Sequence, residues 1–311
     1  MADSTTRERM EQIFDSTRNW GRWGPEDERG ALNLITAEKR VAAAACVRSG
    51  RSVSCARDLP VHPAVDNPHP ALHMMIQGGD DCVVPGMGFE STTDFVGVAF
   101  HGLATSHLDA LCHVFVKSRM YNGFEAAEVK STGARRGSVM SCAEGIVTRG
   151  VLLDIPRLVG EEWLELGTEI TPEQLEAAES AQRVRTAEGD VLLVSTGRDA
   201  RRKAKGPWNP IQDGFAGLQA ECLPWLHERG VAVLGSDGIS DALPGPGVPD
   251  WPMPIHQVAL AGMGVHLLDN LKLDRLAVAC AEQSQWEFLF SAAPLRVAGG
   301  TGSPLNPVAV L

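Results

Sequence analysis

Short apolar runs separated by helical segments dominate the second half of the chain, and this alternation restricts the possible folds more than any other feature. Three runs have the length and composition of buried strands: Gly150–Ile155, Asp190–Thr196 and Val231–Gly235. Runs of this length that are apolar almost throughout are typical of strands covered on both faces. We therefore expect helices packed against a partly parallel sheet.

Helix signals lie between these runs. The sequence Thr171-Pro-Glu-Gln174 places an N-cap threonine before a proline at the first helical position, and the glutamine completes a capping-box pattern. This predicts a helix that runs toward Arg185. A second helix is expected near Leu218–Glu228, and a final strand near Leu276–Ala281.

The first third of the chain predicts a polar helix, an alanine-rich helix and several short strands. The helices are expected over Thr5–Thr17 and Ala37–Val47. Three short apolar runs read as strands: Arg51–Ala56, His73–Gln77 and Val96–Phe100. No low-complexity linker or internal repeat divides the 311 residues, so we expect one α/β domain over residues 1–311.

The net charge of −11 excludes some classes of partner. A chain without a basic face has little to offer nucleic acid phosphates, so no nucleic-acid partner is expected. No apolar stretch reaches membrane-spanning length, and no basic segment followed by an apolar run opens the chain. We expect a cytoplasmic protein that acts on a small molecule, without a membrane partner.

The seven cysteines are scattered, odd in number and never spaced as C-x-x-C. This spacing favours neither a disulfide framework nor a zinc ribbon. Cys112 lies between apolar neighbours, so we interpret it as a buried structural thiol rather than a nucleophile or ligand.

One stretch, Phe100–Val114, concentrates groups that bind metals. It contains His101, His107, Asp109 and His113, and no lysine or glutamate separates them. In an extended chain, residues two apart point to the same side, so His107 and Asp109 can face one point. A helical turn after Asp109 would bring His113 onto the same face. Convergent imidazole and carboxylate groups suit Zn²⁺ or Mn²⁺. The spacing does not decide between one ion and two.

The segment Ser106-His-Leu-Asp-Ala-Leu-Cys-His113 resembles the T-H-x-D-A-x-x-H signature of the cyclase family, which includes bacterial kynurenine formamidase and isatin hydrolase. These are metal-dependent hydrolases. The resemblance implies their swivelling β/β/α-type fold, a mixed sheet flanked by helices, in a single domain. It also implies a homo-oligomer, a dimer or a tetramer.

A second segment, Pro254–Leu271, resembles the H-x-x-L-L-x-x-G-I-x-x-x-E-x-L segment of the formamidases. By that resemblance His256 and Asp269 complete the metal cluster. Asp269 is one carbon shorter than the family's glutamate and one residue further along, so it suits either one metal rather than two or a contact with substrate. His266 lies in a strand between apolar neighbours and reads as structural.

The chain departs from the family pattern at Leu103, where the family has a histidine. The nearest replacement is His101, but a fully extended chain would carry it about 20 Å from His107 at about 3.3 Å per residue. A shared metal therefore requires a bulge or turn, which Gly102 permits. We expect His101 to be a ligand on this condition.

Four residues are candidates for substrate binding. Trp20 and Trp23 lie in a glycine-bearing loop, where they serve either as packing anchors or as pocket walls; a similar W-G-x-x-D-x-x-G-x-L-N segment in the family favours the pocket. Tyr121 either packs or contacts substrate. Thr301, in a glycine-rich segment that resembles one near the family's active site, either lines a substrate carbonyl or belongs to a structural loop.

These features predict a hydrolase that cleaves an amide or lactone, cyclic or open, of an aromatic or carboxylate-bearing molecule. A metal would make hydroxide available at neutral pH, and Asp109 and His113 would act in catalysis, His113 as the proton shuttle. Two alternatives stay open: a lactone hydrolase or dehydrating cyclase, and an inactive binding homologue. The departures at Leu103 and Asp269 keep the second alternative open.

Overall fold

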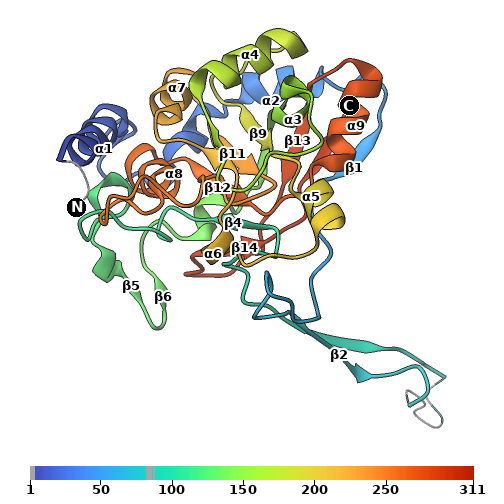
Figure 1. Ribbon diagram of the computed structural model, residues 1–311. Helices are drawn as coiled ribbons and strands as arrows, with labels where there is room; N and C mark the ends of the chain where they lie inside the picture. The colour runs from blue at the N-terminus through green and yellow to red at the C-terminus, as the bar shows by residue number, and fades with distance from the viewer. Residues whose placement is uncertain (1–3, 82–85, 87) are drawn as a thin grey trace.

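A mixed sheet forms the centre of the fold (Figure 1). The computed structural model describes residues 4–81, 86 and 88–311. Within these residues, nine strands pair in the order β1-β15-β13-β7-β9-β11-β12-β4-β14. The four central strands are parallel: β7 (Ile146–Asp154), β9 (Val191–Ser195), β11 (Val233–Ser236) and β12 (His266–Asp269). The apolar runs predicted the first three of them.

Antiparallel strands extend the sheet on both sides. On one side lie β13 (Glu287–Ala292), β15 (Val308–Val310) and β1 (Ser52–Ser54). On the other side, β4 (His107–Asp109) pairs with β12, and β14 (Gly302–Pro304) pairs with β4. Segments that lie before and after the parallel strands in the sequence, β4 and β13, therefore flank them in the sheet.

Helices cover both faces of this sheet. Leu153, Leu192 and Leu234 share one buried cluster with side chains of α4 (Pro172–Gln182) and α7 (Cys222–Glu228). Their neighbours along the strands point the other way and pack against α9 (Asp274–Gln283). Both faces of the strands are buried, which is why their sequences are apolar rather than alternating.

The remaining elements are short, apart from the first two helices. The predicted helices at the N-terminus are α1 (Ser4–Thr17) and α2 (Ala37–Ala44), and both halves of the capping box begin α4. The short elements are η1 (Gly30–Leu34), η2 (Tyr121–Gly123), η3 (Ala126–Glu128), β5 (Val129–Lys130), β6 (Gly133–Ala134), η4 (Val139–Cys142), α3 (Ile155–Val159), β8 (Glu169–Ile170), α5 (Arg198–Lys205), α6 (Pro210–Asp213), β10 (Gly217–Leu218), α8 (Pro254–His256) and the π-helix η5 (Gln257–Met263).

The strand expected near Leu276–Ala281 is wrong, because this segment lies within helix α9. Leu276, Ala279 and Cys280 are buried at helical spacing, and Asp274 stands in the first turn, where a carboxylate is favourable. An apolar run of this length does not distinguish a strand from a buried helix, and the alanines favour the helix.

A hairpin of β2 (Leu72–Gln77) and β3 (Thr93–Gly97) projects from the body of the molecule (Figure 1). The strand expected over Val96–Phe100 corresponds to β3, which begins and ends earlier, at Thr93 and Gly97. The chain that returns from this hairpin continues directly into Phe100 and His101.

The cysteines of the described residues are free and buried, which includes Cys112, for which burial was predicted; Cys82 lies outside the described residues. Burial raises the pKa of the Cys112 thiol to about 12, so this group is a poor nucleophile at neutral pH. Among the described residues, no helix combines the length and apolarity that crossing a membrane requires.

Candidate metal centre

The register between β4 and β12 brings the first candidate ligands together. Asp269, the last residue of β12, pairs with His107, the first residue of β4. Because side chains two apart on a strand share a face, Asp109 points to the same side as His107. His107, Asp109 and Asp269 each offer a ligand atom, and these atoms lie within 4.8 Å of one another. All three side chains are buried.

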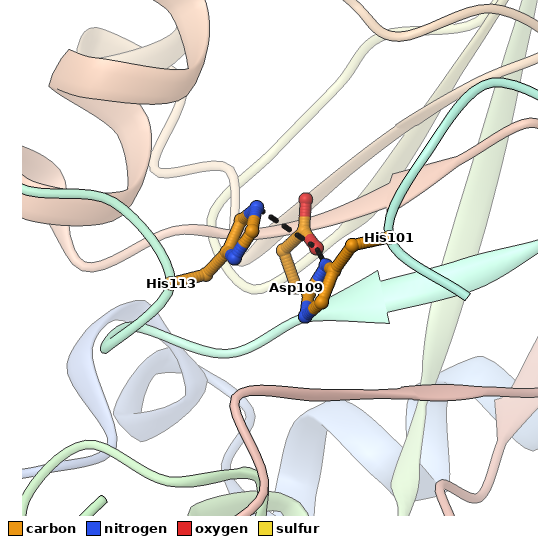
Figure 2. Close-up of side chains that lie close together, drawn as sticks. All are labelled: His101, Asp109 and His113. Atoms are coloured by element: carbon orange, nitrogen blue, oxygen red, sulfur yellow. Dashed lines mark ion pairs between the residues drawn. The ribbon is translucent and has the colours of Figure 1, made fainter. Parts of the chain in front are cut away.

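A second group shares Asp109 with the first. His101 Nδ1 lies 2.8 Å from Asp109 Oδ1, and His113 Nε2 lies 3.9 Å from the same oxygen (Figure 2). The rings of His101 and His113 stack with their centroids 3.8 Å apart. His113 arrives through a turn, in which its N–H donates to the Ala110 carbonyl, and not through a helix. The chain does turn after Gly102, so His101 reaches the cluster.

His256 completes the cluster from the end of α8, where the π-helix begins. Its Nε2 lies 3.1 Å from Asp269 Oδ2 and 3.6 Å from Asp109 Oδ2. Its Nδ1 lies 2.6 Å from Asp241 Oδ2, so the Nδ1–H donates to this carboxylate and Nε2 faces the cluster. A histidine oriented by a carboxylate in this way is a common arrangement around metals.

The buried charges of the cluster shift the pKa values of its histidines and carboxylates. Burial opposes charge on His107 and His256, but the Asp109 carboxylate raises the pKa of His107, and Asp269 raises that of His256 well above its ordinary value. Burial also works against the Asp109 carboxylate, yet His107 holds its pKa well below the ordinary value. Burial lowers the pKa of His113 to about 4, so its imidazole is neutral at pH 7.

Several buried atoms at the centre of the cluster have no hydrogen-bond partner. They are His101 Nδ1, both carboxylate oxygens of Asp109, and Asp269 Oδ1. Buried polar atoms are rarely left unpaired, because the lost hydration costs about 1–3 kcal/mol per group. Carboxylate oxygens and ring nitrogens that converge on one buried point, with part of their hydrogen-bonding capacity unused, are what a cation requires, so the residues present fit a metal. Neutral imidazole and carboxylate ligands suit Zn²⁺ or Mn²⁺.

A cavity of about 310 Å³ lies beside the cluster. Its wall includes His107, Asp109, His113, His256 and Asp269. The rest of the lining is mostly apolar: Gly102, Leu103, Val114, Ile239, Pro252, Met253 and Gln257. A concave apolar site with a few convergent polar groups is the usual form of a small-molecule site.

The expected substrate-binding residues lie elsewhere. Trp20 donates from Nε1 to the Ala261 carbonyl at 2.7 Å, and the buried Tyr121 donates its hydroxyl proton to Asp27 at 2.9 Å. Trp23 packs against the main core beneath the Arg22 guanidinium. Within the described residues, none of the three is part of the cavity wall, so their role in binding stays a prediction that the lining does not support.

Thr301 also lies outside the cavity wall of the described residues, but it contacts a ligand candidate. Its Oγ1 lies 2.9 Å from His101 Nε2. With Nε2–H as the donor in this hydrogen bond, the Nδ1 lone pair remains available on the side that faces Asp109. Thr301 is therefore placed to orient His101, while the sequence left it open between lining a substrate carbonyl and a structural loop. His266 is fully buried in β12, in agreement with a structural role.

Sequence reasoning missed Asp241. This residue follows β11 after a short loop and accepts hydrogen bonds from the N–H groups of Ile255 and His256, as well as from the His256 ring. The available signal was its position just beyond the carboxyl end of a buried parallel strand, where ligand sites gather in open α/β sheets.

Replacing Asp241 with asparagine should weaken metal binding at the buried group. The amide keeps the shape of the carboxylate but loses the charge that orients His256. Loss of such an outer partner typically lowers metal affinity about 10- to 100-fold. Competition with a chromophoric chelator measures this change. Asp27→Asn is a matched control, because Asp27 also accepts hydrogen bonds from a side chain and a backbone N–H but contacts no ligand candidate. Equal affinities of Asp241→Asn and wild type would contradict the assignment.

Histidine and carboxylate side chains at one edge of a mixed sheet, beside an apolar cavity, define the chain as an α/β protein with a candidate metal centre. It belongs to the cyclase family, whose profile, described as Cyclase, matches residues 52–241. No protein of curated function matches it.

Solved structures share the whole fold. One described as a novel cyclase is 30% identical, with a TM-score of 0.84 over 95% of this chain and 100% of that one. Isatin hydrolase A from Labrenzia aggregata, bound to benzyl benzoate, is 23% identical, with a TM-score of 0.60 over 88% of this chain and 98% of that one. Isatin hydrolase A from Ralstonia solanacearum is 23% identical, with a TM-score of 0.57 over 88% and 97%.

Proposed function

We propose that the chain is a metal-dependent hydrolase that holds two divalent cations, Zn²⁺ or Mn²⁺, and cleaves an amide or lactone of a small aromatic molecule. The observation that carries this proposal is the position of Asp109. The Asp109 carboxylate belongs to both ligand groups beside one cavity, and neither of its oxygens has its hydrogen-bonding capacity satisfied. Membership of the cyclase family, and the activity that the name isatin hydrolase indicates for two structures of similar fold, support the same class of reaction.

The ligands divide into two sets that share Asp109. His101, Asp109 and His113 would hold one ion, and His107, Asp109, His256 and Asp269 the other. When bound, such cations lower the pKa of water and polarise a carbonyl oxygen. The chain's own residues fix the direction of these ligands: Asp241 orients His256, and Thr301 orients His101.

His113 faces the cavity and suits two tasks. Its neutral imidazole can serve as the third ligand beside His101 and Asp109, or it can accept a proton from water and pass it to the leaving atom. His113→Ala distinguishes the two. Loss of one ion identifies a ligand, whereas retention of both ions with loss of turnover identifies a proton shuttle.

The cavity wall favours an uncharged aromatic substrate over a carboxylate-bearing one. The described residues that line it include no lysine or arginine. Its one amide side chain, Gln257, already bonds the Asp250 carbonyl and the Met253 N–H. A carboxylate on the substrate would therefore have no basic side chain as a partner within this lining. We propose that apolar contacts hold the body of the substrate, while the metal centre holds the carbonyl.

The proposal is tested by metal content and turnover together. We expect His107→Ala to lose bound metal and all hydrolysis of a panel of aryl amides and lactones, because this buried imidazole would be a ligand. His266→Gln, a change at a buried histidine on the neighbouring strand, should keep both. Activity that survives thorough chelation would refute the proposal. Metal without turnover across the panel would favour an inactive binding homologue, and dehydration products would favour a cyclase.

A further inference from the structure

The short loop between His101 and His107 holds an unusual conformation. Six residues of extended chain would separate these side chains by about 20 Å. Their ring centroids are instead 5.4 Å apart, so the loop folds back on itself. This fold brings His101 to Asp109, while Leu103 packs against a separate apolar cluster of Trp208, Phe215 and Ile239.

The carbonyl groups of this loop are held by the side chain of Asn270. Its Nδ2 donates to the Gly102 carbonyl at 2.8 Å and to the Thr105 carbonyl at 3.3 Å. The Thr105 carbonyl also accepts a hydrogen bond from His107 Nδ1 at 2.8 Å, which leaves His107 Nε2 facing the cluster. One amide therefore bonds both ends of the fold-back and contacts the group that orients His107.

Arg198 orients that amide and holds the middle of the loop. Its Nη1 donates to Asn270 Oδ1 at 2.5 Å, and its Nη2 donates to the Leu103 carbonyl. The guanidinium is buried against the rings of Trp208 and Phe215, the same rings against which Leu103 packs. Since Asn270 Oδ1 accepts from Arg198, its NH₂ group must point toward the Gly102 and Thr105 carbonyls.

We propose that Asn270 and Arg198 are positioning residues: they clamp residues 102–105 so that His101 replaces the ligand that the family has at position 103. Asn270 directly follows Asp269 and is fully buried. The clamp thus connects the loop between His101 and His107 to strand β12, which carries the third ligand candidate, Asp269. This inference rests on the proposed function, since it concerns how the chain presents ligands to the ions.

A double-mutant cycle on metal affinity tests the clamp. Each variant is loaded with Zn²⁺, its metal content is measured by elemental analysis, and each affinity is measured by competition with a chelator. We expect Asn270→Ala and His101→Ala each to weaken binding of the ion held by His101, Asp109 and His113 about 10- to 100-fold. The other ion should change much less, because the pairing of β4 with β12 still holds His107 in place. Because Asn270 acts through His101, adding Asn270→Ala to His101→Ala should change the affinity for neither ion further.

Two further variants separate positioning from stability. Asn67→Ala removes another buried asparagine whose amide donates to two loop carbonyls, those of Pro60 and His62, and it should leave both affinities unchanged. Arg198→Lys keeps the charge but loses the fork that reaches two acceptors, so it should weaken the same ion as Asn270→Ala; it also serves if Asn270→Ala fails to fold. The visible spectrum of the Co²⁺-loaded protein should change alike in Arg198→Lys and His101→Ala.

The outcomes distinguish the clamp from the proposed function. Wild type with two ions, and additive losses in the double variant, would overturn the clamp alone. The clamp alone would also be overturned if neither Asn270→Ala nor Arg198→Lys changed the affinity for an ion. Wild type that binds no divalent ion would overturn the proposed function itself.

Discussion

Asp109→Asn should abolish both metal binding and turnover. Asp109 is the one side chain that both ligand groups contain, and the asparagine amide replaces a charged oxygen with a hydrogen-bond donor. Transition-state stabilisation by metals is worth several kcal/mol, so hydrolysis should fall by more than about a thousandfold. Elemental analysis of the purified variant and turnover at saturating metal measure the two effects.

Asp190→Asn is the control for removing a buried aspartate. Asp190 is fully buried and pairs with Arg149 at 2.6 Å and with Lys39 at 2.6 Å, far along the sheet from the cluster. This variant should lose stability but keep both ions. If Asp109→Asn is purified with two ions and near-normal turnover, Asp109 does not bridge them.

A large loss of stability is expected from Gly264→Ala. Gly264 ends the π-helix that follows His256, with φ +70°, in the left-handed region. A Cβ there would lie 2.5 Å from the Tyr121 ring and 2.9 Å from the Gly30 Cα. The backbone costs about 1–2 kcal/mol and the overpacking about 1–3 kcal/mol, so the free energy of unfolding should fall by about 2–5 kcal/mol. Urea unfolding measures this loss.

Gly50→Ala isolates the packing part of that loss. Gly50 has nearly the same φ, +72°, but no atom of its surroundings lies within 4 Å of a built Cβ. It should therefore show only the backbone cost of about 1–2 kcal/mol. If the two variants lose equal stability, the close packing of Gly264 against Tyr121 and Gly30 adds nothing to the loss. The position of the loop that contains Gly30 then does not depend on this contact.

Much of the fold was predictable because its signals are local. The capping box at Thr171 and the apolar runs of β7, β9 and β11 depend on contacts within a few residues or on burial of both faces. The failure at Leu276–Ala281 has the same origin. A short apolar run does not indicate whether it forms a strand within a sheet or a helix that packs on the face of a sheet. Here the run forms part of α9, which packs on the sheet.

In the candidate site, too, the features that depend on local sequence were predictable. The spacing of His107 and Asp109 predicted their common direction, since alternation is a property of any strand. Family resemblance added His256 and Asp269, and the structure brings both to the cluster. For Tyr121 the sequence left packing and substrate contact both open, because a turn sequence does not reveal which side of a loop faces a cavity.

By itself, the sequence determined the apolar strands β7, β9 and β11, the start of α4 and the pair His107–Asp109, since each depends on neighbours along the chain. Only the tertiary structure decided that β4 lies beside β12, that Asp241 orients His256, and that residues 102–105 fold back so that His101 reaches Asp109. The physical reason is that these contacts join segments up to about two hundred residues apart, as in Thr301 with His101, and strand order and loop path place them. The local propensity of a sequence predicts neither the order of the strands nor the path of a loop.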